Sequence, residues 1–162
     1  MNGVAEKITA EIESCGAIPF ARFMELALYC PVYGYYEKEE DTIGRGGDYY
    51  TSVSVGPLFG ELLAFQFAGW LETNAPPQTP GSPSAVRCAE RAQIVEAGAH
   101  RGALAGDILR WMRQQRPAVF QRLEYCIIEP SDRRRRWQQE TLAEFAAKVR
   151  WARSLAALVS PA

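Results

Sequence analysis

The 162-residue sequence lacks the features that mark several large classes of protein. No apolar run approaches the ~20 residues that a membrane-spanning helix needs. The net charge of −1 at pH 7 gives no general attraction to nucleic acids or anionic membranes. The first residues, MNGVAEKITAEIESCG, contain acidic side chains and no long apolar segment, unlike a secretory or transit signal. We therefore expect a cytoplasmic protein with neither membrane nor nucleic-acid partners.

Cysteine and histidine are both scarce, which argues against a metal centre and against a hydrolase. The four cysteines, Cys15, Cys30, Cys88 and Cys126, are far apart and form no CxxC pair. Zinc sites usually take their ligands in close pairs, so we expect no metal and four reduced thiols. The single histidine, His100, has no nucleophile elbow nearby, so a hydrolase triad is not expected.

The chain changes character near its middle, although its length favours one domain. Residues 1–73 are predicted to form a helical arm, with helices over 4–15, from about 19, and over 57–71. Residues 74–85, NAPPQTPGSPSA, are rich in Pro, Gly and Ser and indicate a flexible loop.

Residues 86–162 carry a different pattern, in which strands and helices alternate. The predicted elements are a strand over 92–97, a helix over 103–115, a strand over 123–129, a helix over 131–148 and a short strand near 149–151. This order predicts an α/β fold with a parallel, doubly wound sheet behind the amino-terminal helical arm.

The segment IVEAGAHRGALAGDILRWM reads as a buried strand, a turn with two glycines and a helix. In a parallel α/β sheet, ligands bind beyond the carboxyl ends of the strands. Gly98 and Gly102 permit a positive φ and a close approach of the backbone to a ligand. The helix that starts near Ala103 favours an anionic or electron-rich ligand at its amino end. Glu129 ends the next strand, where a carboxylate can accept hydrogen bonds from both hydroxyls of a ribose.

The turn by itself leaves two interpretations open. It fits the acid-x-G-x-G-x-G form found in methyltransferases, except that the middle glycine is replaced. A cofactor turn would be formed by Glu96, Gly98, Ala99, His100 and Gly102. The dinucleotide pattern G-x-G-x-x-G is not met, which disfavours a nicotinamide-dependent oxidoreductase. A nucleotide-type cofactor site and an empty structural turn both remain possible interpretations at this point.

Four motifs in order, FARFMELALYCPVYGYY, IGRGGDYYTS, LFGELLAFQ and VEAGAHRGALAGDILR, resemble one known family. It is the family of S-adenosylmethionine-dependent methyltransferases that includes the mitochondrial complex I assembly arginine methyltransferase and MidA. The resemblance covers about Ile18 to Trp151. It implies a class I, Rossmann-like methyltransferase fold, here as a partial sheet with an amino-terminal helical arm. It also implies S-adenosyl-L-methionine as cofactor and a protein arginine as methyl acceptor.

The resemblance also assigns roles to individual residues. It makes residues 96–102 the cofactor turn and Glu129 the ribose acid. The residues that match the family's loop over the cofactor are Gly47, Asp48, Thr51 and Ser52. Asp48 is the candidate catalytic residue, the alternative being a cap of a turn. Methyl transfer needs positioning and exclusion of water more than a nucleophile–base pair.

The sequence departs from the family at two positions and in length. His100 replaces a glycine of the cofactor turn. There it is a solvent-facing or hydrogen-bonded turn residue, a contact of the cofactor, or a general base. Ser54 stands where relatives usually carry glutamate. The later strands of the family are absent, so we expect a truncated chain that is inactive alone. Three explanations stay open: an amino-terminal fragment, a naturally truncated gene, or a chain that completes its core by pairing with another chain through the exposed sheet edge. The alternative is a non-catalytic relative that acts as a binding or assembly module.

Overall fold

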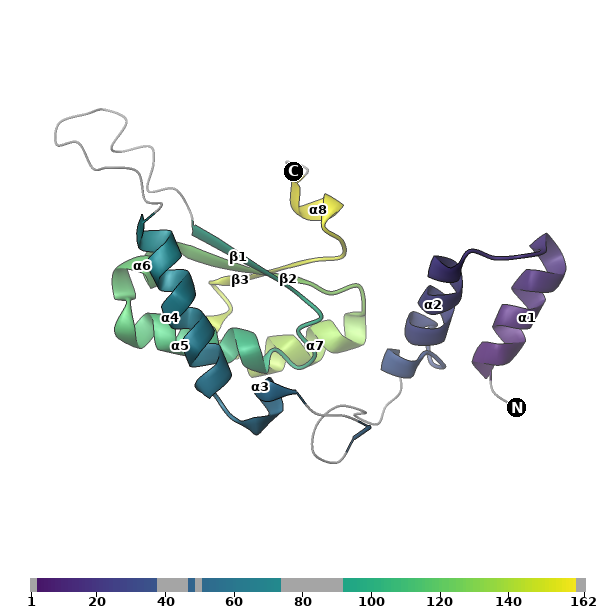
Figure 1. Ribbon diagram of the computed structural model, residues 1–162, viewed down its shortest axis with the longest axis horizontal. Helices are drawn as coiled ribbons and strands as arrows, with labels where there is room; N and C mark the ends of the chain where they lie inside the picture. The colour runs from purple at the N-terminus through teal and green to yellow at the C-terminus, as the bar shows by residue number, and fades with distance from the viewer. Residues whose placement is uncertain (1–2, 38–46, 49–50, 74–91, 160–162) are drawn as a thin grey trace. The chain divides into compact units, whose positions relative to one another are not determined.

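The computed structural model describes residues 3–37, 47–48, 51–73 and 92–159 (Figure 1). The chain forms two compact units, Met1–Ser54 and Val55–Ala162. Among the described residues, no helix has both the length and the apolar character needed to cross a bilayer. The cytoplasmic location and the absence of nucleic-acid partners stay predictions.

The first unit contains the expected helical arm. Its helices are α1 (Gly3–Cys15) and α2 (Phe20–Tyr29), followed by the 3-10 turn η1 (Tyr35–Glu37), with the short α3 (Ser52–Val55) at the boundary. Arg22 joins the first two helices through a two-point ion pair, with its Nε and Nη2 2.8 and 2.9 Å from the Glu11 carboxylate. Little of this unit is buried, Leu26 and Cys30 being its buried apolar side chains among the described residues.

The second unit is an α/β structure built on parallel strands. In chain order its elements are α4 (Leu58–Thr73), β1 (Ala92–Ala97), α5 (Ala103–Gln115), α6 (Pro117–Arg122), β2 (Leu123–Ile128), α7 (Asp132–Thr141), η3 (Ala143–Phe145), β3 (Val149–Ala152) and α8 (Ala156–Val159). The described strands form one parallel sheet in the order β1-β2-β3. The predicted parallel α/β fold is therefore confirmed.

The two faces of this sheet differ. Ile94, Tyr125 and Ile127 belong to the apolar core that α5 helps to build, and Figure 1 shows α5 and α7 on one side of the strands. Residues 93, 124 and 150 alternate with that set and point the other way. On this second face the Gln93 amide donates to the Glu124 carboxylate at 2.9 Å.

Helix α4 packs against α5 through a row of small residues. Gly60, Ala64 and Ala68 are buried, and a Cβ added at Gly60 would lie 2.6 Å from the Asp107 Cβ. Only glycine therefore allows this approach of the two helices. The sequence predicted a helix that is apolar nearly all round, and its other side is exposed, with Leu58, Leu62, Phe65 and Trp70 among the exposed residues.

Several element boundaries differ from those predicted. Helix α6 was not expected, and the helix predicted over 131–148 ends at Thr141, followed by η3 and a turn. The structure groups α4 with the sheet rather than with the arm. The predicted division into residues 1–73, 74–85 and 86–162 stays a prediction, because residues 74–91 lie outside the described part of the chain.

Candidate functional site

The turn after β1 takes a left-handed backbone at three positions. Gly98, His100 and Gly102 have φ values of 78°, 49° and 82°. The Gly102 N–H donates to the Ala99 carbonyl at 2.6 Å, which closes the turn. His100 thus adopts the conformation that glycine would supply in the family pattern. A non-glycine residue in this region is strained by roughly 1 kcal/mol or more.

The two glycines of the turn face different surroundings. Gly98 is exposed, and a Cβ added there would meet no atom within 4 Å, so the backbone is open to a ligand. A Cβ on Gly102 would lie 3.1 Å from the Leu142 Cδ1, so this glycine packs against the protein instead. Gly102 is also the N-cap of α5, and no side chain caps that helix. Helix N–H groups without a side-chain cap are suited to an anionic or electron-rich ligand.

Glu129 lies immediately after β2 and is only 3% exposed. Its Oε1 accepts from the Ser131 N–H at 3.0 Å, and its Oε2 accepts from the Gln138 Nε2 at 2.9 Å. Its own N–H donates to the Ala152 carbonyl at 2.8 Å, which ties it to the end of β3. An ionised carboxylate has about four acceptor positions, so these two bonds leave capacity for two hydroxyl donors.

Gln138 is a site residue that the sequence analysis missed. Its side chain is fully buried, and its Nε2 donates to both the His100 carbonyl (3.0 Å) and Glu129 Oε2 (2.9 Å). Its Oε1 accepts from the Trp151 indole N–H at 3.0 Å. Helix α7 is strongly polar, so a glutamine within it looks like a solvent-facing residue. No sequence signal separates Gln138 from the exposed Gln139 beside it.

Glu96, the acid of the turn motif, lies on the core side of β1. Its carboxylate accepts a hydrogen bond from the Tyr125 hydroxyl at 2.9 Å. Burial raises the pKa of Glu96, and the tyrosine hydrogen bond opposes that rise without cancelling it. Burial and the adjacent carboxylate also raise the pKa of Tyr125. The arrangement holds a poorly hydrated carboxylate beside the turn.

The structure brings together one of the two predicted residue groups. Residues 96–102 and Glu129 gather at the carboxyl ends of β1 and β2 in the second unit. The residues that match the family's loop over the cofactor, Gly47, Asp48, Thr51 and Ser52, belong to the first unit. There the exposed Asp48 accepts a hydrogen bond from the Tyr35 hydroxyl at 2.7 Å. The assignment of both groups to a cofactor stays a prediction.

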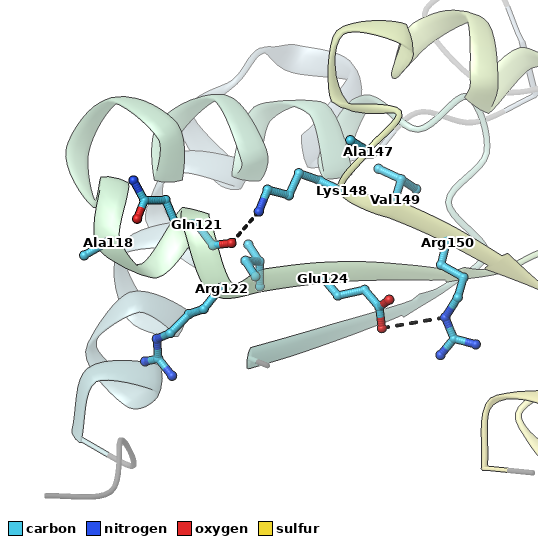
Figure 2. A pocket seen from close by; sticks show the side chains of 9 residues that line it. Ala118, Gln121, Arg122, Glu124, Ala147, Lys148, Val149 and Arg150 are labelled. Carbon is cyan, nitrogen blue, oxygen red and sulfur yellow. Dashed lines mark hydrogen bonds and ion pairs between the residues drawn. The ribbon is translucent and has the colours of Figure 1, made fainter. Parts of the chain in front are cut away.

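A hollow of about 540 Å³ lies at the opposite ends of the strands, where β2 and β3 begin (Figure 2). Lys148 Nζ donates to the Gln121 carbonyl at 2.6 Å, and Arg150 Nε lies 3.6 Å from Glu124 Oε2. None of the predicted site residues lines this hollow. Among the described residues there is also no group of three His, Cys, Asp or Glu side chains placed to hold a metal ion.

The chain is similar to known proteins both in its sequence and in its structure. A protein family described as "Putative S-adenosyl-L-methionine-dependent methyltransferase" matches residues 62–161, more than half of the chain. The chain is 37% identical over 112 residues to protein arginine methyltransferase NDUFAF7 of Danio rerio, which covers 68% of this chain and 23% of the relative. For the human protein of the same name the identity is 38% over 105 residues, covering 64% of this chain and 21% of the relative. Both relatives are described as mitochondrial.

A solved structure is similar over nearly the whole chain. It is a COG1565 superfamily member from Burkholderia thailandensis bound to S-adenosyl-homocysteine, with a TM-score of 0.70 and 33% identity. The match covers 94% of this chain and 37% of the solved one. The resemblance inferred from the motifs and the partial Rossmann-like methyltransferase fold are thereby confirmed. The chain spans less than a quarter of the length of the curated relatives it matches.

Proposed function

Because this chain belongs to the family of S-adenosyl-L-methionine-dependent methyltransferases, we propose that it binds the adenosyl cofactor and takes part in methylating a protein arginine. The main observation in support is that Gly98 and Glu129 directly follow the ends of two neighbouring strands. They directly follow Ala97 and Ile128, which are register partners in the β1–β2 ladder. An open glycine and a carboxylate at adjacent strand tips suit a ligand that contains a ribose.

The residues at these strand tips fit the cofactor chemically. The spare acceptor capacity of Glu129 matches the two vicinal hydroxyls of a ribose. The open backbone at Gly98 leaves room for a close approach of the ligand. The amino end of α5, which no side chain caps, offers N–H groups to the carboxylate of the cofactor's amino-acid part. When bound, S-adenosylmethionine supplies a methyl group activated by a sulfonium centre.

The chain's own residues position the reactants rather than forming a covalent intermediate. Methyl transfer requires the acceptor and the methyl group to be held in line and apart from water. The Glu96 carboxylate, poorly hydrated and held by Tyr125, adds negative charge near the turn, which favours a cationic ligand. This role of Glu96 is electrostatic and requires no proton transfer.

The proposed methyl acceptor is an arginine of a protein, as the names of the relatives indicate for those proteins. Asp48 is our candidate for binding the acceptor, because a carboxylate matches the planar fork of a guanidinium. The Tyr35 hydroxyl bond, at 2.7 Å, restricts the orientations of the Asp48 side chain.

Calorimetry with S-adenosylhomocysteine tests the proposal directly. We expect the native chain to bind this ligand and Gly98→Val to abolish binding, because the new side chain would occupy the open face of the turn. Gly16→Val is the matched control, since Gly16 also has a positive φ of 81° and no atom within 4 Å of an added Cβ. Absence of binding by the native chain would refute the proposal and favour a non-catalytic module. Equal losses in both variants would attribute the effect to backbone strain.

A further inference from the structure

Gln138 joins three segments that are separate in the sequence. They are the turn after β1, through the His100 carbonyl, the tip of β2, through Glu129, and β3, through Trp151. The three hydrogen bonds lie between 2.9 and 3.0 Å, and the side chain is fully buried. Water therefore does not compete for these bonds, and a buried polar group left without its partners would be strongly unfavourable.

The surroundings fix the orientation of this amide. The indole N–H of Trp151 is only a donor, so the amide oxygen must face it. The His100 carbonyl and the Glu129 carboxylate are acceptors, so the amide nitrogen must face them. A flipped amide would oppose donor to donor and acceptor to acceptor. One side chain thus sets the distance between the turn and the carboxylate.

The neutrality of the amide also matters. A lysine or arginine at this position would form an ion pair with the Glu129 carboxylate and would compete with any ligand hydroxyl. A glutamate would repel it. Glutamine donates one hydrogen bond to Oε2 and leaves the negative charge in place. The remaining acceptor positions of Glu129 are therefore oriented but not neutralised.

We propose that Gln138 is a positioning residue that makes the site selective for a ligand with an intact ribose diol. The inference rests on the proposed binding of the adenosyl cofactor. Gln138 acts through Glu129, because its amide donates to both Glu129 Oε2 and the His100 carbonyl and so holds the carboxylate beside the turn. Gln138 also supports the left-handed conformation at His100, because its amide nitrogen donates to the His100 carbonyl in that conformation.

The test measures the affinities of S-adenosylhomocysteine and of its 2′,3′-dideoxy counterpart, and compares their ratio. The native chain should strongly prefer the ligand with the diol. In Gln138→Met, which keeps the side-chain length, we expect that preference to fall by about tenfold, the size of one lost hydrogen bond to a charged group. The matched control is Gln139→Met, because Gln139 is the exposed neighbour on the same helix. This control should keep the native preference.

The outcomes separate this inference from the proposed function. If the native chain binds neither ligand, both are refuted. If it binds S-adenosylhomocysteine but Gln138→Met weakens both ligands by the same factor, only the positioning role fails, and Gln138 is merely structural. If that variant does not fold, Gln138→Glu replaces it, because glutamate has the same shape, keeps an oxygen acceptor for the Trp151 indole N–H and removes both amide donors. A folded Gln138→Glu protein with an unchanged preference would also overturn the inference.

Discussion

The two ends of the parallel strands carry their polar groups in opposite ways. At the carboxyl ends, Glu129 and Gln138 are buried and bonded to each other. At the amino ends, the Arg150 and Glu124 side chains keep 44% and 26% of their exposure and meet at 3.6 Å. A hollow lies at the amino ends, beside these solvated charges (Figure 2). In the proposed site, oriented and desolvated acceptors, rather than a hollow, are the feature that would recognise a ligand.

Removing one carboxylate at each end is the strongest way to break this comparison. Glu129→Ala should weaken S-adenosylhomocysteine binding by about two orders of magnitude, through loss of two hydrogen bonds to a charged group. It should also destabilise the fold by about 1–3 kcal/mol, because the Ser131 N–H and the Gln138 amide lose their acceptor. Glu124→Ala should change stability by less than about 1 kcal/mol, as for other partly exposed ion pairs. Calorimetry measures the loss of binding, and urea denaturation measures the loss of stability. Similar losses for Glu129→Ala and Glu124→Ala would contradict the difference between the two ends.

A second pair of variants tests how strongly the backbone of the turn after β1 is constrained. Gly102→Ala should destabilise the fold by about 2–3 kcal/mol, because φ is 82° and the new Cβ would lie 3.1 Å from the Leu142 Cδ1. Gly98→Ala should cost only about 1 kcal/mol, since its φ of 78° is unfavourable but the space is open. Urea denaturation of the two variants gives this order. The reverse order would place the packing contact at Gly98 instead.

The smallest expected effect has the opposite sign and depends on pH. Burial raises the pKa of Glu96 above its ordinary value of 4.5, so the folded protein holds the proton more tightly than the unfolded chain. The stability present below pH 4.5 should therefore be lost as the pH rises through the higher, folded-state pKa. Glu96→Gln should remove this contribution to the pH dependence and leave the protein at least as stable as the native one at pH 7. Thermal unfolding of the native protein and of Glu96→Gln between pH 4 and 7 measures this pH dependence. A variant that is less stable than the native protein at pH 7 would refute the prediction.

Much of the second unit could be predicted from local patterns. The bounds of β1 and α5 match those predicted, because an apolar strand, two glycines and a periodic helix follow one another without ambiguity. The location of Glu129 at a strand tip follows from the same alternation of strands and helices. Helix α6 was missed even though Pro117 stands at its first turn, a position that proline favours, so the signal was present.

Other features depend on contacts that no local pattern contains. Neither proline nor glycine follows Thr141 before β3, so the sequence does not show that α7 stops there. The chain leaves the helix there because it must return to start β3. The role of Gln138 could not be predicted either, because it arises only when three separate segments meet in the folded chain. The left-handed conformation at His100 likewise follows from the closed turn rather than from the residue type.

The order of the strands in space has a consequence for how the sheet assembles. The spatial order of the described strands in the sheet is β1-β2-β3, which is also their order along the chain. Each described strand after β1 therefore finds its partner after closure of a single segment that runs from strand through helix to strand. Folding is faster when contacts are close in sequence. The sheet can thus grow one strand at a time as the polypeptide is synthesised, with β1 and β2 forming the template on which β3 is added.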